Sequence, residues 1–251
     1  MKTIIACLTM IFILQINCSA QEMPSIQTDR PDQTECPFIV PLHYFQFETG
    51  FSYEQVNSEA SEVVAPTVLT RFAINNHFEL RMITEYVFDK VDSKDFSGFN
   101  PIAFGFKTRL FEEKGFIPVT SFMGHIALPK AASKEFKSTY FAPDFRLTMQ
   151  HTLSKRQSLS YNLGAEWDGE HADPIFVYTI TTGYSFSDKI GGYVEFYGFV
   201  PQYEVPDHRF DAGVTYLITA NQQLDVSGGV GLSRLSPDYF VSLGYSFRFK
   251  I

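Results

Sequence analysis

The sequence contains little cysteine, a single tryptophan and few charges, and these shortages exclude several classes of protein. Of its three cysteines, Cys7 and Cys18 lie in the first twenty residues, so Cys36 stands alone in the rest of the chain. A disulfide framework within one copy is therefore excluded. Acidic residues outnumber basic ones by 28 to 20, whereas binding to nucleic-acid phosphates requires a net basic face. Nucleic acid is therefore not an expected partner.

No apolar run beyond the first twenty residues is long enough for a membrane helix. Lys2, the apolar run Ile4 to Leu14 and the small-residue exit Cys18-Ser19-Ala20 predict a cleaved signal peptide over residues 1–20. A retained anchor would need about 20 apolar residues. Lipid attachment at Cys18 is disfavoured because Gln15-Ile16-Asn17 lacks the expected small residues. Loss of Lys2 with the leader changes the net charge from −8 to −9.

Aromatic residues are abundant. The 26 phenylalanines and 13 tyrosines raise the aromatic share to 16%, while charged residues reach only 19%. Aromatic side chains fit the pleated surface of a sheet, so the composition favours strands. In lipid, only helices and closed barrels satisfy every backbone polar group. If the mature chain spans a membrane, it must therefore do so as a barrel.

The C-terminus shows the clearest strand pattern. Its apolar positions Val241, Leu243, Tyr245, Phe247, Phe249 and Ile251 alternate with Ser242, Gly244, Ser246, Arg248 and Lys250. One apolar and one polar face running to the last residue are typical of a strand that faces lipid. Similar segments recur upstream, although residues 116–128 and 190–200 alternate poorly and their facing stays open. We predict an all-β fold: a transmembrane antiparallel up-and-down barrel of about twelve strands over residues 42–251.

The connections between these segments alternate in length, as expected of outer-membrane barrels with short periplasmic turns and longer outer loops. Short turns are predicted near residues 75–76, 112–115, 154–157, 187–189 and 220–222. The outer connections are predicted at residues 57–65, 90–99, 130–138, 169–173, 202–207 and 236–238. Several aromatic residues lie near predicted strand ends: Tyr44, Tyr53, Tyr86, Tyr140, Trp167, Tyr184 and Tyr239. Aromatic girdles at the membrane interfaces and simple filling of the strands explain their positions equally well.

The residues between the leader and the first strand cannot form a regular element, because prolines occupy positions 24, 31, 37 and 41. We expect residues 21–41 to be an irregular segment that lies either in the periplasm or in the barrel lumen. The sequence leaves both positions open.

This segment carries a motif that resembles a known family. Thr28, Asp29, Arg30, Pro31, Asp32 and Glu35, followed by Val40-Pro41 and by Gln46, Glu48 and Gly50, resemble the family named for the MetA pathway of phenol degradation. The resemblance covers essentially the whole mature chain. It implies an outer-membrane barrel that transports small solutes, with hydrophobic or aromatic molecules among the candidates. Cys36 departs from the small residue usual there, and this does not affect the fold.

Charged residues opposite the apolar stripe are expected to face the lumen. They are Glu48, Glu54, Arg71, Glu79, Arg81, Glu85, Lys107, Arg109, Arg146, Glu166, Asp168, Asp211, Asp225 and Arg248. Two interpretations stay open. The charges line a narrow water path and set which solutes pass, or they neutralise one another inside a closed interior.

Other functions have weaker support in the sequence. Lipid-modifying barrel enzymes pair a serine with a histidine, but no such pair with an orienting group is readable around His43, His77, His125, His151, His171 or His208. No metal-ligand spacing occurs, and we expect no cofactor. A structural or surface-binding role stays open. The expected partners are outer-membrane lipid, a small solute and, during biogenesis, the barrel-assembly machinery, with the protein as a monomer.

Overall fold

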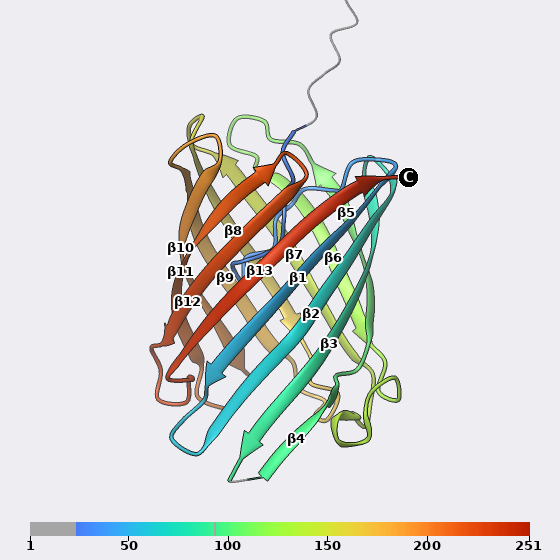
Figure 1. Ribbon diagram of the computed structural model, residues 1–251, viewed down its shortest axis with the longest axis vertical. Coiled ribbons are helices and arrows are strands. Elements are labelled where there is room, and N and C mark those ends of the chain that lie inside the picture. Colours follow the sequence, from blue (N-terminus) through green and yellow to red (C-terminus); the bar gives the residue numbers. More distant parts are fainter. Residues whose placement is uncertain (1–23, 93) are drawn as a thin grey trace, which may run out of the picture.

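In the computed structural model the chain forms an antiparallel barrel (Figure 1). The structure describes residues 24–251 apart from residue 93, so the predicted signal peptide lies outside the described residues. The strands are β1 (Tyr44–Gln55), β2 (Ala60–Asn75), β3 (Phe78–Val91), β4 (Lys94–Phe99), β5 (Ala103–Phe111), β6 (Val119–Ala127), β7 (Ala142–Thr152), β8 (Gln157–Glu166), β9 (Ile175–Ser185), β10 (Ile190–Pro201), β11 (Asp207–Thr219), β12 (Gln222–Gly231) and β13 (Tyr239–Lys250). Within this part of the chain, no helix is long and apolar enough to cross a membrane.

Twelve strands close the barrel, which confirms the predicted fold class. The first and last strands pair along their whole length, from Tyr44 opposite Lys250 to Gln55 opposite Tyr239. Every other neighbouring pair is also antiparallel, and β3 pairs with both β2 and β5. Closure leaves no unpaired edge among the twelve barrel strands, as the lipid environment requires.

The predicted loop at residues 90–99 is wrong, because these residues contain the end of β3 and a thirteenth strand, β4. It pairs only with the end of β3, as a hairpin that projects beyond the barrel wall (Figure 1). Lys90 opposes Asp95 across this hairpin, an opposite-charge pair that favours the register. The hairpin contacts the short 3-10 turn η1 (Lys134–Phe136), because the Phe99 amide donates to the Ser133 hydroxyl at 2.9 Å.

Side chains alternate between the lipid face and the lumen as the period of two predicts. Leu243 and Leu163 on the outer face are 57% and 56% exposed, whereas the inward Arg71 and Lys107 are fully buried. The poorly alternating segments also have a defined facing. In β10 Glu195 points inward beside Tyr197, and in β6 Met123 points inward. Large apolar groups on both faces of these two strands hid the period in the sequence.

The two ends of the barrel differ. The start of β1 and the end of β13 lie at one end of the barrel, where the connections between strands are short. The longer loops and β4 lie at the opposite end (Figure 1). The short turns agree with the predicted periplasmic set, because β2 ends at Asn75 and β3 begins at Phe78. We call the end with the termini periplasmic and the other end outer. Near the periplasmic end the lipid face carries a stacked group of rings, with Phe45 4.6 Å from Phe72 and Phe47 5.4 Å from Phe247.

Candidate functional site

The residues before β1 lie inside the barrel and fill part of its lumen (Figure 1). We call residues 24–41 the plug. At the periplasmic end the Ile26 amide donates to the Ala220 carbonyl at 2.8 Å, and farther along the Val40 amide donates to Glu79 at 2.9 Å. Irregular backbone inside a barrel needs partners for its polar groups. The charged lumen side chains supply them.

Asp29 is the centre of a buried ion cluster. One of its carboxylate oxygens lies 2.6 Å from Arg81 and 3.3 Å from Arg71, while Lys107 contacts the other at 2.9 Å. Glu79 and Glu48 complete the cluster through Arg71, each at 2.9 Å. Burial by itself favours the neutral acid, but the three cations hold the pKa of Asp29 well below its usual range. Asp29 is therefore ionised in the docked plug.

The same cluster binds the plug backbone. Glu48 accepts hydrogen bonds from the amides of Asp29 and Arg30 at 2.8 and 3.1 Å. Arg71 donates to the Phe38 carbonyl at 2.7 Å, and Lys107 donates to the Cys36 carbonyl at 2.7 Å. Removing one partner from such a buried charge network typically costs about 3–5 kcal/mol. The cluster therefore fixes the plug against the wall formed by β1, β2, β3 and β5.

Arg30 fixes the next part of the plug in a slot between two strands. Gly50 on β1 opposes Gly244 on β13, and a Cβ atom at either position would lie 2.4 Å from the Arg30 guanidinium group. Through this gap Arg30 reaches Asp225 at 3.0 Å and the Ser242 hydroxyl at 2.9 Å. Only glycine at both positions leaves room for the guanidinium group.

The other side of the lumen is acidic. Glu195 on β10 accepts hydrogen bonds from the Gln33 amide at 2.7 Å and from the Thr34 hydroxyl. Asp32 and Asp211 make no ion pair in the described part of the chain. Burial, together with the nearby carboxylates of Glu195 and Asp211, raises the pKa of Asp32 well above its usual range. Within the same lumen, two plug carboxylates three residues apart therefore have opposite environments.

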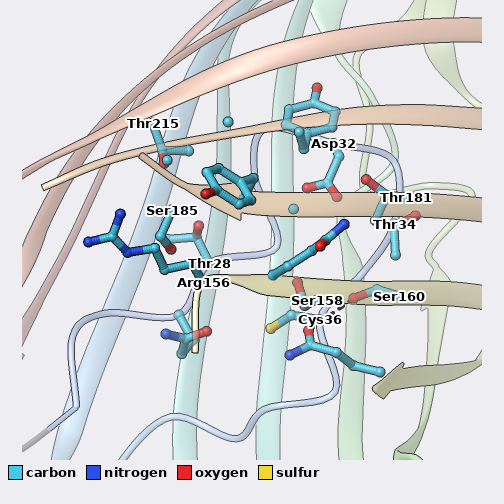
Figure 2. Close-up of a pocket in the computed structure, with 18 of the residues that line it drawn as sticks. Thr28, Asp32, Thr34, Cys36, Arg156, Ser158, Ser160, Thr181, Ser185 and Thr215 are labelled. Carbon is cyan, nitrogen blue, oxygen red and sulfur yellow. Dashed lines mark hydrogen bonds between the residues drawn. The ribbon is translucent and has the colours of Figure 1, made fainter. Parts of the chain in front are cut away.

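Two cavities lie along this acidic side, one on each side of the plug. The periplasmic cavity is about 370 Å³ and is walled by plug residues and by strands β7 to β11. Figure 2 shows its hydroxyl-rich lining, with Thr28 and Thr34 from the plug facing Ser158, Thr181 and Thr215 from the wall. The outer cavity is about 180 Å³. Pro31 and Asp32 line both cavities, so this short piece of the plug separates them.

The remaining lumen candidates lie apart from the ion cluster. Glu85 accepts from Asn100 at 3.1 Å, Arg109 pairs with Glu112 at the periplasmic turn, and Arg146 contacts Glu166 at 3.4 Å. Arg248 donates to the Asn221 side chain at 2.8 Å. The expectation for Asp168 is wrong, because this residue lies in an outer loop and contacts His171 at 2.6 Å. Strand β8 ends at Glu166, two residues earlier than the pattern suggested.

Glu195 and Glu62 are among the acidic residues of the lumen that the sequence did not identify. Glu195 belongs to the segment whose facing was open. Glu62 was placed in an outer loop, but β2 already begins at Ala60, and Glu62 opposes Glu54 across β1. Residues 60–64, Ala-Ser-Glu-Val-Val, do not alternate between apolar and polar residues, so the sequence carried no period-two signal for Glu62.

In the described part of the chain, no histidine ring nitrogen hydrogen-bonds a serine hydroxyl. His125 faces Asp144 at 3.1 Å inside the lumen, and His151 lies beside Tyr161 on the lipid face. Among residues 24–92 and 94–251, no group of three His, Cys, Asp or Glu side chains is placed to hold a metal ion.

Comparison with solved structures identifies other barrels of the same shape. The structure is similar to the COG4313 outer membrane channel from Pseudomonas putida F1, with a TM-score of 0.65 and 12% identity over 85% of this chain and 98% of that one. It is also similar to the NanC porin, with a TM-score of 0.56 and 10% identity over 81% and 98% of the two chains. The structure of the KdgM porin in complex with disordered oligogalacturonate has a TM-score of 0.53 and 12% identity over 82% of this chain and 99% of that one. At these identities the likeness shows the fold alone.

No curated protein matches the sequence. A family model described as "Putative MetA-pathway of phenol degradation" matches residues 28–249, which is most of the chain and includes the plug motif. The match agrees with the resemblance seen in the sequence. The chain therefore belongs to this family.

Proposed function

We propose that this protein is an outer-membrane channel for small solutes, and that its passage follows the acidic side of the lumen past Pro31 and Asp32. The observation that carries the proposal is the pair of cavities that share these two residues. On the other side, the ion cluster and the packed plug fill the lumen. The path for solutes would therefore run between the plug and strands β7 to β11 in the periplasmic cavity, and past β10, β11, β13, β1 and β2 in the outer cavity.

The chemistry of the passage favours small polar solutes over large apolar ones. The periplasmic cavity is lined mainly by hydroxyl and amide groups, and its volume of about 370 Å³ lies near the lower end of the usual range for ligand pockets. The family name and the similar channels support transport of some small solute. Transport of hydrophobic or aromatic cargo stays a proposal.

The proposal is tested by reconstitution of the mature protein from isolated outer membranes. Faster gel migration before boiling than after it first establishes that the barrel is folded. We expect discrete single-channel steps in planar bilayers, and swelling of liposomes in small neutral solutes. A heat-modifiable protein that gives neither conductance nor swelling contradicts the channel and favours an anchoring or surface-binding role.

A further inference from the structure

We propose that three buried carboxyl groups form a proton-dependent latch, which holds plug residues 31–34 between the two cavities and releases them as the pH rises. The groups belong to Asp32 of the plug, Glu195 of β10 and Asp211 of β11. The inference rests on the proposed channel and adds a regulation of the same passage. Pro31 and Asp32 line both cavities, so movement of this short piece would join them.

Glu195 and Asp211 share a proton on the lumen wall. They lie directly opposite each other on neighbouring strands, and only 1% and 2% of the two residues are exposed. Their carboxyl groups are hydrogen-bonded to each other, which requires a proton on one of them. The Tyr193 hydroxyl donates to the Oδ2 atom of Asp211 at 3.1 Å, while Oδ1 is buried without another partner among the described residues. Asp211 therefore carries the proton and donates it to Glu195.

The Glu195 carboxylate that accepts this proton also binds the plug. It accepts hydrogen bonds from the Gln33 amide at 2.7 Å and from the Thr34 hydroxyl. Loss of the Asp211 proton would place two buried negative charges opposite each other, which is unfavourable unless water enters. Water can reach the pair only where the plug moves away, so ionisation of the pair weakens docking of residues 31–34.

Asp32 makes the plug itself sensitive to pH. Burial, followed by the charge of Glu195, raises the pKa of Asp32 well above its usual range, so this acid is neutral in the docked plug. In water it ionises near its ordinary pKa of about 3.9. An acid that keeps its proton only when docked weakens docking as the pH rises from that value through its raised pKa. Each pH unit in this window lowers the ratio of docked to released plug by up to about tenfold per proton.

No cation among the described residues is paired with these three acids. Arg30, Arg146 and Arg209 lie nearby, and each forms an ion pair with another carboxylate. Lys155 and Arg156 line the periplasmic cavity from an exposed turn. The remaining titratable groups around the latch are acids or phenols and supply no positive charge as the pH rises: Asp29, Glu35, Glu54, Glu62, Tyr193, Tyr197 and Asp225.

The ion cluster keeps the rest of the plug docked at the same pH values. Asp29 is ionised there, and its partners Arg71 and Arg81 keep their charges. Lys107 donates to the Cys36 carbonyl at 2.7 Å, just beyond the latch. Release is therefore confined to residues 31–34.

The test measures site-resolved hydrogen exchange of the folded barrel in detergent at pH 6 and pH 9, corrected for the intrinsic pH dependence of exchange, because protection reports local opening. Single-channel conductance is recorded at the same pH values. We expect protection of the Gln33 amide to fall at least about tenfold at pH 9 and conductance to rise. The amides of Ile26 and Val40, which bond Ala220 and Glu79, should keep their protection.

Two variants remove the ionisable groups without removing the contacts. Asn at position 32 mimics the neutral acid, and an Asn amide at position 211 donates to Glu195 at every pH. Asp32→Asn and Asp211→Asn should each reduce the loss of Gln33 protection at least about threefold, and the double variant should keep its pH 6 protection at pH 9. Asp238→Asn, an exposed acid outside both cavities, should behave as the wild type.

Equal protection of Gln33 at the two pH values in the wild type overturns the latch, and so do variants that respond as the wild type does. Asp32 lies on the plug rather than in the barrel wall, so its variant keeps the test valid if Asp211→Asn fails the gel test for folding. Protection that falls at pH 9 without conductance contradicts the channel and leaves the latch standing. Conductance with constant protection does the reverse.

Discussion

Asp29 and Asp32 lie three residues apart in the plug, yet they meet opposite surroundings. Asp29 contacts Arg71, Arg81 and Lys107, and its pKa is held low. Asp32 faces the carboxylates of Glu195 and Asp211, and its pKa is raised by burial and by their charge. The first side of the lumen neutralises itself and holds the plug. On the second side Asp32 and Asp211 have no cationic partner among the described residues and lie beside cavities, which is the arrangement expected of a path rather than of a core.

This comparison can be tested through Cys36, the one cysteine among the described residues. Its thiol lies in the plug, and burial, followed by the charge of Asp29, raises its pKa to about 12. Since the thiolate is the reactive form, the docked thiol should react slowly at pH 8, and release of the plug should return its pKa to about 8.5. The rate of labelling by a poly(ethylene glycol) maleimide therefore reports plug release.

The largest effect is expected from Asp29→Asn. The substitution leaves Arg71, Arg81 and Lys107 without their shared carboxylate, at a cost of about 3–5 kcal/mol in plug docking. Labelling of Cys36 should accelerate at least about 100-fold. An unchanged labelling rate in a heat-modifiable variant would show that the ion cluster does not hold the plug.

Gly244→Ala should give a smaller effect on the same readout. The new methyl group overlaps the Arg30 guanidinium and Asp225, and such overpacking costs about 1–3 kcal/mol. We expect labelling of Cys36 to rise about tenfold. Gly228→Ala is the matched control, because its Cβ atom points to lipid and meets nothing closer than 3.2 Å. Equal rates for the two variants would argue against the slot.

Glu166→Gln tests how far the neutralised side of the lumen extends beyond the ion cluster. Glu166 lies 3.4 Å from Arg146, and both side chains keep some exposure, so the pair should contribute about 1 kcal/mol or less. Labelling of Cys36 should change less than about fivefold. A change as large as that of Asp29→Asn would extend the cluster to β7 and β8 and remove the difference between the two sides.

Asp211→Asn addresses the acidic side and should leave Cys36 labelling unaltered. Lumen charges tune which ions pass, so at pH 9, where the acidic side is ionised, we expect wild-type channels to prefer cations and the variant to lose part of that preference. Reversal potentials in a potassium chloride gradient measure the ratio. An unchanged ratio of cation to anion permeability would place the ionic path away from Asp211. Arg109→Gln is the control, because Arg109 pairs with Glu112 at a periplasmic turn.

The sequence predicted the barrel, its strand number and the facing of most charges, because a period of two with one lipid face leaves little freedom. It did not predict that Arg71, Arg81 and Lys107, which lie on three neighbouring strands, converge on Asp29, since that contact depends on the position of the plug. It also left the plug position open, because prolines only exclude regular structure. Glu195 stayed unassigned because aromatic residues occupy both faces of β10, and Glu62 because β2 extends beyond its hydrophobic span.

The most direct test of the account compares two single-cysteine variants in a Cys36→Ser background. Ser158 lines the periplasmic cavity, whereas Ser121 is fully buried and donates to the Pro37 carbonyl at 2.6 Å on the plug side. The measurement is single-channel current before and after a small methanethiosulfonate reagent modifies Ser158→Cys or Ser121→Cys, with labelling checked by mass. The account predicts a current that falls on modification of Ser158→Cys and stays constant with Ser121→Cys. Block through position 121, or an unaltered current after complete labelling at position 158, would contradict it.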